Sequence, residues 1–331
     1  MLNSEKPLVS IGIPIYNGEN KIADALDALV AQDYPNIEII ISDNGSTDRT
    51  RSVCEKYLLL DSRIRYLRSE KNSGTIWNFN RVFALSSGKY FMCAAHDDSR
   101  ESSFISACVS ELEKFPEAVL CQATTNLYIE GRDELMCTNV LNSYVGTVTI
   151  VDRYRETIKN FPATAIYGVY RSESMRKTKL LENCIATDLA FIQELSIYGQ
   201  FIGVDKVLFT YRGRKKWNSV HEDYQVFYGK KRKPIWHIPF IILLFNNCKR
   251  VIGSPLLLPV KCHLLWILFG HELQQIFIKI SIRLIKLIWS KKLKERIGLA
   301  LYWRWMHNPN TIVVCKDLFI ERIIKPKLRW L

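Results

Sequence analysis

The sequence predicts an α/β fold followed by a basic helical region, and three observations support this. Short apolar runs alternate with helical patterns over the first two hundred residues, which is typical of βαβ units and a mostly parallel sheet with right-handed crossovers. Hydrophobic residues make up 48% of the 331 residues and charged residues 24%, so a core of ordinary size can form. The third observation is that charge is divided unevenly along the chain.

The expected strands are short apolar runs bounded by turn residues. The run at residues 37–41, for example, is rich in isoleucine. Between residues 131 and 161 the pattern weakens, and we expect an excursion of short strands or loops there. The expected strands, in order, are residues 8–15, 37–41, 64–67, 89–95, 118–129, 167–171 and 201–211.

The expected helices lie between these strands and carry apolar residues at helical spacing. In the first, Ile22, Leu26 and Leu29 share one face. The second is expected to begin at a cap residue, Ser46 or Thr47. The expected helices, in order, are residues 21–32, 47–60, 75–85, 103–115 and 188–198.

The charge separates the chain into two parts. Residues 1–211 contain 22 Lys/Arg and 27 Asp/Glu, a net charge of −5, whereas residues 212–331 contain 24 and 6, a net charge of +18. The first part has the charge of an ordinary soluble enzyme. The second requires an anionic partner, which can be nucleic acid, a membrane surface or an acidic substrate.

The cysteines and the N-terminus narrow the class of protein. There are nine cysteines and none forms a CxxC pair, which argues against a disulfide scaffold and a structural zinc site and favours a reducing compartment. Residues 1–7 are polar, so we expect no signal peptide. No uncharged apolar run reaches ~18 residues, so we expect no transmembrane helix.

The C-terminal part, residues 234–331, follows a basic linker at residues 215–233. Apolar runs at 235–245 and 256–269 precede a stretch at 274–289 whose cationic side chains and isoleucines fall on different helical faces. We expect amphipathic helices on the cytoplasmic face of the cell membrane, peripheral or monotopic, held by apolar burial and anionic lipid. Two alternatives stay open: a helical subdomain packed on the N-terminal part of the chain, and a hairpin of the first two runs that inserts more deeply.

Polar side chains follow four successive predicted strands. In open parallel sheets, ligands bind at the carboxyl ends of the strands, so this placement predicts a ligand site. The four segments are Pro14-Ile15-Tyr16-Asn17-Gly18, Asp43-Asn44-Gly45-Ser46-Thr47-Asp48, Asn72-Ser73-Gly74 and His96-Asp97-Asp98.

The absence of phosphate-binding loops points to a metal. The sequence contains neither GxGxxG nor GxxxxGK[ST], the loops that hold a diphosphate at a helix N-terminus. A nucleotide diphosphate then needs Mg²⁺ or Mn²⁺, held by one or two carboxylates together with phosphate oxygens. Asp97 and Asp98 are the candidate metal ligands. The alternative is a solvated turn in which Asp98 or Ser99 caps the next helix.

Two residues are candidates for binding a nucleoside. Asp43 ends the isoleucine-rich strand and can accept a hydrogen bond from a base or ribose. The alternative is that it only forms an Asx turn. Tyr16 can offer a ring on which the base stacks, and the alternative is a half-buried aromatic side chain.

The order and spacing of these elements resemble glycosyltransferase family 2. The resemblance rests on residues 9–17, the DNGSTD segment at 43–48, Asn72 to Gly74 with Asn78, and the Asp97-Asp98 pair. It covers residues 8 to about 214. It implies a GT-A fold and transfer of a sugar from a nucleotide-sugar with inversion at the anomeric carbon. It also implies a catalytic domain at 1–214, with a donor half at about 1–100 and an acceptor half at about 101–214.

The resemblance assigns roles to residues of the donor site. Asp97 matches the metal-binding acid of a DxD-like motif, but the first acidic position of that motif is Ala95. The remaining positions form two groups. Pro14, Tyr16, Asn17 and Asp43 match nucleotide-sugar-binding positions, and Asn72, Gly74 and Asn78 match the floor of that site.

Downstream, the resemblance assigns a base and two cations. Asp188 matches the general base, with Thr187 in place of the usual Glu; the alternative is that Asp188 only caps the following helix. Arg212 and Arg214 match a closing Tyr-Arg-x-His element, with Arg214 where His is common, and a cation there can stabilise the leaving diphosphate. The alternative is a solvated basic loop.

Other functions stay open from the sequence. A nucleotidyltransferase is disfavoured because the chain lacks a Gly-rich phosphate loop. Nucleic-acid binding is disfavoured because the basic region interleaves its charges with long apolar runs. A catalytically inactive family member that only binds sugar nucleotides is disfavoured by the presence of Asp43, Asp97 and Asp188. We therefore expect a nucleotide-sugar donor, a glycan or lipid-linked acceptor in surface polysaccharide assembly, and no nucleic acid.

Overall fold

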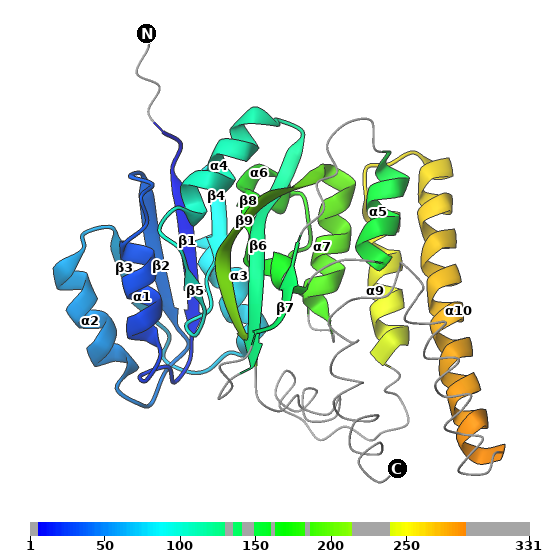
Figure 1. The fold of residues 1–331 in the computed structure, drawn as a ribbon, viewed down its shortest axis with the longest axis horizontal. Helices are drawn as coiled ribbons and strands as arrows, with labels where there is room; N and C mark the ends of the chain where they lie inside the picture. The colour runs from blue at the N-terminus through cyan, green and yellow to red at the C-terminus, as the bar shows by residue number, and fades with distance from the viewer. Residues whose placement is uncertain are drawn as a thin grey trace.

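The structure, a computed structural model, describes residues 6–129, 135–140, 149–159, 163–182, 186–213 and 239–288. These residues form a nine-stranded sheet with helices on both faces (Figure 1). The strand order is β3-β2-β1-β4-β8-β6-β9-β5, and β7 pairs with β6 outside this path. The strands are β1 (Val9–Ile15), β2 (Ile37–Asp43), β3 (Ile64–Arg68), β4 (Tyr90–Cys93), β5 (Ser99–Arg100), β6 (Ala118–Ile129), β7 (Leu135–Asn139), β8 (Val169–Arg171) and β9 (Gln200–Gly213). The helices are α1 (Ile22–Val30), α2 (Thr50–Leu60), α3 (Thr75–Ala84), α4 (Phe104–Lys114), α5 (Ile150–Lys159), a 3₁₀ helix (Ala163–Tyr167), α6 (Ser172–Arg176), α7 (Thr187–Tyr198), α9 (Pro239–Gly253) and α10 (Leu258–Ile288).

Two apolar layers cover the sheet. On one face, side chains of α1, α2 and α4 such as Leu26, Cys54 and Phe104 pack on β1, β2 and β6. On the other, α3 and α7 contribute Val82 and Phe191. The central strands are buried on both faces, which is why their sequences are continuous apolar runs.

The expected mostly parallel sheet is confirmed for β1 to β4 and for the β6–β9 pair, whereas β5, β7 and β8 pair antiparallel to their neighbours. β1 pairs in parallel with β2 and β4, and β2 pairs in parallel with β3. β8, however, inserts between β4 and β6 and runs antiparallel to both, with Tyr170 opposite Phe91 and Leu120. The sheet is therefore mixed. Local alternation of strands and helices cannot reveal this, because β8 pairs with segments about 80 and about 50 residues before it in the chain.

The start of the second helix differs from the expectation. The helix begins at Thr50 rather than near Thr47, and neither Ser46 nor Thr47 caps it. The N-cap position is Arg49, and Asp48 just before it accepts hydrogen bonds at its carboxylate from the Thr50 backbone N–H (3.0 Å) and hydroxyl (2.5 Å). Residues 44–49 are therefore free to form a turn at the end of β2.

The weakly patterned segment at residues 131–161 contains an expected short strand, β7, and an unexpected helix, α5. Just before the helix, the Thr149 hydroxyl accepts from the Asp152 N–H (3.2 Å) of the first turn and donates to the Asp152 carboxylate (2.6 Å). Its buried face is narrow and centres on Tyr154 and Ile158. A face with so few apolar residues gives only a weak helical pattern in the sequence. The helix is stabilised by packing against α7, α9 and α10.

The C-terminal helices pack on the catalytic body. The expected separate segments 256–269 and 274–289 are joined in α10, whose 31 residues span about 46 Å at 1.5 Å per residue. Leu264 and Leu268 of α10 and Val251 of α9 form a buried cluster with Tyr154 of α5 and Ile197 of α7. The described start of the C-terminal region thus packs as the subdomain alternative expects.

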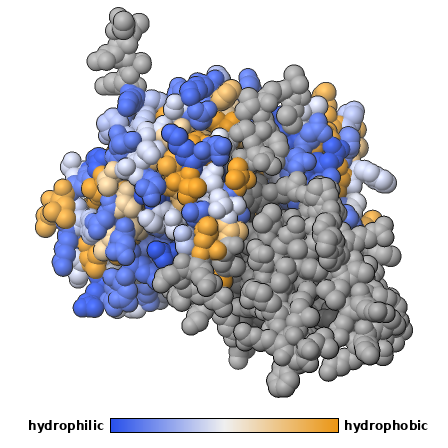
Figure 2. Space-filling view, in the orientation of Figure 1, coloured by the Kyte–Doolittle hydropathy of each residue, from blue (hydrophilic) through white to orange (hydrophobic). Residues whose placement is uncertain are grey.

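The outer face of α10 stays apolar and exposed. Leu258, Trp266 and Leu273 are 73%, 78% and 66% exposed, and Figure 2 shows apolar surface over the described part of this helix. Among the described residues, no helix is long and apolar enough to cross a membrane. The basic linker at 215–233 lies outside the described residues. Membrane association stays a prediction.

The packing of α10 predicts opposite effects for two neighbouring substitutions. Leu264→Ala removes a fully buried side chain and should lower the free energy of unfolding by about 2–4 kcal/mol. Trp266→Ala removes an exposed one and should change it by less than about 0.5 kcal/mol. Thermal and denaturant unfolding of the full chain measure both. Equal effects would mean that α10 does not pack on the body in this orientation.

Candidate active site

The predicted site segments meet at one edge of the sheet. β1, β2, β3, β4, β6 and β9 all run in the same direction, so their carboxyl ends lie together at the lower edge in Figure 1. Only Gly199 separates the end of α7 from the start of β9, so α7 ends near the opposite edge of the sheet. Its first turn therefore lies toward the edge where the carboxyl ends of the strands meet. The register places Asp43 beside Ile15 on one side and Arg68 on the other.

Hydrogen bonds connect the turn after β2 to the turn after β1. The Asn17 backbone N–H donates to the Ser46 hydroxyl (2.9 Å), and the Thr47 N–H donates to the Asn17 side-chain oxygen (2.9 Å). The Gly18 N–H donates to the Thr50 hydroxyl (2.8 Å). Asn17 adopts a positive φ of 53°, which asparagine tolerates better than most residues. The two segments therefore behave as one rigid unit.

Asp43 is fully buried and its carboxylate already has partners. One oxygen accepts from the Ser46 N–H (2.8 Å), three residues later, so Asp43 does hold its own turn, although an Asx turn would use the N–H of Gly45. The other accepts from the Tyr66 hydroxyl (2.5 Å) and lies 3.5 Å from the Arg68 guanidinium. Burial and Asp43 together raise the pKa of Tyr66, so Tyr66 stays a donor. The binding of a nucleoside by Asp43 stays a prediction.

Asn78 joins three elements beneath this turn. The side chain is 3% exposed. Its amide nitrogen donates to the Ser42 carbonyl (2.9 Å) and the Ile15 carbonyl (3.3 Å), and its oxygen accepts from the Ser42 hydroxyl (2.5 Å). The amide therefore connects α3 to the ends of β1 and β2, which agrees with its predicted place in the floor of the site.

Asn72 and Gly74 are tied to the same turn. The Asn72 side-chain oxygen accepts from the Asn44 amide (2.8 Å) and from the Gly74 N–H (2.9 Å). The Asn44 amide also donates to the Gly74 carbonyl (3.1 Å). Gly74 has φ 95° at the start of α3. Of the predicted nucleoside-binding side chains, Tyr16, Asn17 and Asn72 are exposed, whereas Pro14 is buried.

The two aspartates after β4 have different environments. The Asp97 side chain is 30% exposed and lies 3.6 Å from the Lys21 ammonium. Asp98 is 5% exposed, and one of its oxygens accepts from the Arg212 backbone N–H (3.2 Å). Burial, only partly offset by the nearby Arg100, raises the pKa of Asp98 to about 7. Asp97 thus faces solvent, and Asp98 ties this turn to β9.

Arg100 was not identified from the sequence and supports the acidic turn. Its buried guanidinium lies 4.5 Å from the Phe209 ring and 5.5 Å from the Phe104 ring, and donates to the Cys93 carbonyl (3.2 Å). Residues 99–100 form β5, which pairs with β9, so the predicted alternative of a helix cap at Asp98 or Ser99 is wrong. Lys21 was also missed, although it follows the first strand end in the sequence.

The residues of the acidic turn fit a nucleotide-bound metal. Among the described residues, no group of three or more His, Cys, Asp or Glu side chains could hold a metal unaided. A magnesium or manganese ion that keeps phosphate oxygens as ligands needs only one or two carboxylates from the protein. The partly exposed carboxylate of Asp97 meets that requirement. Asp98 is already engaged with β9, and its role as a metal ligand stays a prediction.

Asp188 lies in the first turn of α7, after Ala186, whose φ is 56°. Burial raises the pKa of Asp188, while hydrogen bonds from backbone N–H groups of the first turn, including Leu189, oppose this. Thr187, which replaces the expected Glu, accepts at its hydroxyl from the Glu182 N–H (2.8 Å). The carboxylate therefore keeps its place at the helix start by local hydrogen bonds. Its role as the base stays a prediction.

The closing basic element is only partly described. Arg212 has an exposed side chain, and its backbone is fixed by Asp98. Arg214 lies outside the described residues. The predicted contact of both arginines with a diphosphate stays a prediction.

Comparison with known proteins identifies a family match over just more than half of the chain and relatives over shorter stretches. Residues 10–184 match the family model named Glycosyl transferase family 2. An uncharacterized glycosyltransferase of Haemophilus influenzae is 39% identical over 108 residues, 33% of this chain and 33% of that protein. The putative teichuronic acid biosynthesis glycosyltransferase TuaG of Bacillus subtilis is 37% identical over 93 residues, 28% of this chain and 37% of TuaG. The chain spans about a third of the length of each relative.

Solved structures share the fold. S. aureus TarS in complex with UDP-GlcNAc matches with a TM-score of 0.59 and 18% identity, over 80% of this chain and 72% of that chain. The mannosyltransferase PcManGT from Pyrobaculum calidifontis, in complex with GDP-Man and Mn²⁺, matches with a TM-score of 0.57 and 13% identity, over 93% and 83%. The GT-A-like sheet expected from the sequence is confirmed.

Two glycines at this edge give a matched test of the turn geometry. Gly45 and Gly74 both have positive φ, 77° and 95°, so alanine at either position should lower the free energy of unfolding by about 1–3 kcal/mol. A Cβ at Gly45 would also lie 2.9 Å from the backbone carbonyl carbon of Lys71, whereas one at Gly74 meets nothing within 4 Å. Denaturant unfolding should therefore show a larger loss for Gly45→Ala. An equal or smaller loss would contradict the described turn.

Proposed function

The chain belongs to glycosyl transferase family 2, and on that premise we propose that it is an inverting glycosyltransferase. It transfers a sugar from a nucleotide-sugar to a hydroxyl of a glycan or lipid-linked acceptor. The observation that carries the proposal is that the turns after β1 and β2, the Asp97 turn and the start of α7 lie at one edge of the sheet (Figure 1). A single displacement requires a donor site and a base that share one cleft.

The substrate class is proposed from the relatives. TuaG is named for teichuronic acid biosynthesis, which supports a place in the assembly of a cell-surface polysaccharide. Two solved structures with a similar fold hold UDP-GlcNAc, or GDP-Man with Mn²⁺, which supports a nucleotide-sugar donor and a divalent cation.

Binding of the donor uses the exposed groups of the edge. We assign the nucleoside to the surface formed by Tyr16, Asn17 and Asn72, above the buried Asp43 and Asn78 layer. Asp97 would hold Mg²⁺ or Mn²⁺, which when bound neutralises charge on the leaving diphosphate. The Arg212 side chain, exposed beside the same turn, adds positive charge there.

The transfer step needs one base and no enzyme nucleophile. Asp188 takes the proton of the acceptor hydroxyl, and that oxygen bonds to the anomeric carbon. The bond from this carbon to the phosphate oxygen breaks on the opposite face, and the nucleoside diphosphate leaves with the electron pair. The pKa of Asp188 is raised by burial, which makes the ionised carboxylate a stronger base.

We propose that the protein works on the cytoplasmic face of the cell membrane, peripherally or monotopically. The net charge of +18 over residues 212–331 favours an anionic surface. The exposed apolar side chains of α10, including Trp266 and Phe269, can enter the headgroup boundary. This position would give access to a lipid-linked acceptor.

Substitution of the base should separate binding from chemistry. Asp188→Asn should retain nucleotide-sugar affinity and lose about 100-fold or more of the transfer rate. In the wild type, the rate should fall with decreasing pH through a pKa above the ordinary aspartate value of 3.8, because burial raises it. Asp205→Asn, in the exposed part of β9, is the matched control. Transfer by Asp188→Asn within a few-fold of wild type would remove Asp188 as the base.

The metal assignment is tested by donor binding. Asp97→Ala should weaken nucleotide-sugar binding in Mn²⁺ by about tenfold or more, and EDTA should weaken wild-type binding similarly. A panel of UDP-, dTDP- and GDP-sugars measured by thermal shift identifies the donor first. Asp33→Ala, on the exposed turn after α1, is the control. If neither EDTA nor the substitution changes affinity, Arg212 and Arg214 must carry the diphosphate instead.

Membrane association is tested with lipid vesicles. The full chain should float with anionic vesicles, less with neutral ones, and less as salt screens the charge. Replacing Trp266 and Phe269 by alanine together should reduce the bound fraction several-fold. Leu59→Ala, at an apolar residue of α2 that is more exposed than either of them, should not. A full chain that stays unbound to anionic vesicles at physiological salt refutes this proposal and leaves the glycosyltransferase proposal standing.

A further inference from the structure

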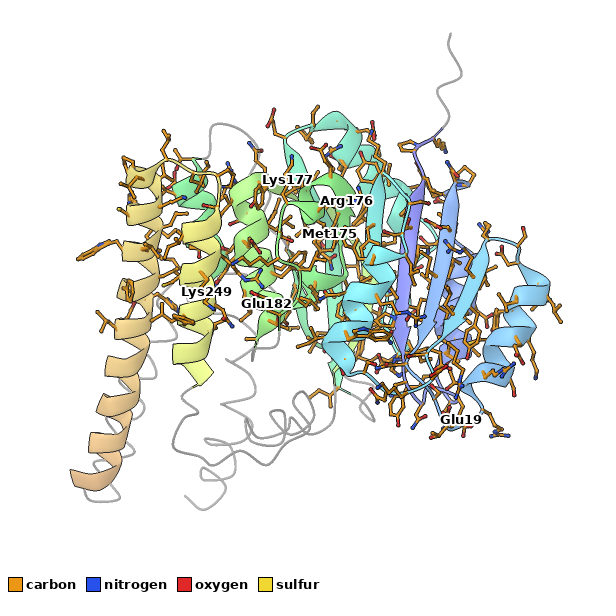
Figure 3. All side chains as sticks on the ribbon, turned by 180° about the vertical axis from the view of Figure 1, so that it is seen from behind. Glu19, Met175, Arg176, Lys177, Glu182 and Lys249 are labelled. Carbon is orange, nitrogen blue, oxygen red and sulfur yellow. The ribbon has the colours of Figure 1, made fainter. Side chains whose placement is uncertain are left out.

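A buried arginine of α9 contacts the segment that leads to Asp188. The Arg250 side chain is 1% exposed. Its guanidinium pairs with Glu194 of α7, pairs with Glu182 (2.8 Å), and donates to the Leu180 carbonyl (2.8 Å). In Figure 3, Glu182 lies beside α9, the helix that carries Lys249 and Arg250. One cation therefore connects the C-terminal region to both α7 and the chain just before it.

The same segment is held from the other side by α3. The Asn80 amide donates to the Leu181 carbonyl (2.8 Å), and its oxygen accepts from the Leu181 N–H (3.2 Å). Asn80 follows the floor residue Asn78 by two positions on α3. Residues 179–182 are thus clamped between the helix that supports the donor site and the helix that carries Arg250.

Residues 179–182 are in turn hydrogen-bonded to α7, including its first residue. The Lys179 N–H donates to the Glu194 carboxylate (3.0 Å), and the Glu182 N–H donates to the Thr187 hydroxyl (2.8 Å), next to Asp188. Leu180 holds a φ of 54°, a conformation that a leucine keeps only where its surroundings over-determine it. The hydrogen bonds of Arg250 and Asn80 supply that constraint.

A buried ion pair attaches a helix only at the cost of removing its charges from water. The apolar cluster of Val251, Leu264 and Leu268 already docks α9 and α10, and apolar residues in place of a buried ion pair often stabilise a protein equally well. What the guanidinium adds is geometry, because its fixed planar donors reach three acceptors at once.

We propose that Arg250 is a positioning residue, which orients the start of α7 and thereby Asp188 for proton transfer. The catalytic unit then extends through α9, beyond the family-matched residues 10–184. The effect on proton transfer by Asp188 rests on the proposed function. The effect on the position of residues 179–182 rests on the hydrogen bonds alone.

The experiment separates positioning from stability in the full chain. Arg250→Met alone leaves Glu194 buried without its cation and should unfold easily. The double variant Arg250→Met with Glu194→Gln has no such charge, so its thermal stability should return close to wild type. The Leu180 and Glu182 contacts remain lost in it. Lys249→Met, on the exposed neighbouring position, is the control.

In the double variant, hydrogen exchange of the peptide covering residues 179–182 should quicken about tenfold, while peptides of β1 stay at the wild-type rate. With the donor identified in the panel, hydrolysis of that nucleotide-sugar should keep its KM and lose about tenfold or more in kcat. The proposal would be overturned if the double variant exchanged at the wild-type rate at residues 179–182, or if its kcat returned to the wild-type value together with its stability. A wild type inactive on the whole panel would count against the proposed function. The exchange rates would still show whether Arg250 holds residues 179–182 in place.

Discussion

The hydrogen bonds of the buried Asn78 amide constrain the whole candidate site. The ends of β1 and β2 must lie close together for this amide to reach the Ile15 and Ser42 carbonyls at once. An unpaired amide in this position would carry a desolvation penalty of about 1–3 kcal/mol, so the strands and α3 keep one arrangement. The turns that follow β1 and β2 are then close enough to exchange the hydrogen bonds of Asn17 and Ser46.

The same principle explains why the polar residues of this edge divide into two layers. Asp43 and Asp98 are buried and bonded to the chain, and they hold turns in place. Tyr16 and Asp97 lie above them and remain accessible. The inner layer fixes the position of the outer one, so a donor would meet groups that are already oriented. Preorganisation of this kind is what electrostatic catalysis requires.

The C-terminal helices have a buried inner face and an exposed outer face. The inner face of α10 completes an apolar cluster with α5 and α7, and Arg250 of α9 adds a charged contact to the segment before Asp188. The outer face keeps large apolar side chains such as Trp266 in solvent. A region joined to the acceptor side of the site by one face and to a membrane by the other would place the acceptor hydroxyl near the base.

The sequence by itself determined the strands and helices of the first half, the family, and the four strand ends where the site lies. These depend on local periodicity and on short motifs, which the residues carry wherever they are. Only the tertiary structure decided that β8 enters the sheet between β4 and β6, that α5 forms, and that Asp98 turns inward while Asp97 faces solvent. It alone brought Arg250 to Leu180, 70 residues away. Each of these depends on partners distant in the chain, because a buried charge or a narrow apolar face is stable only against the particular surface that satisfies it.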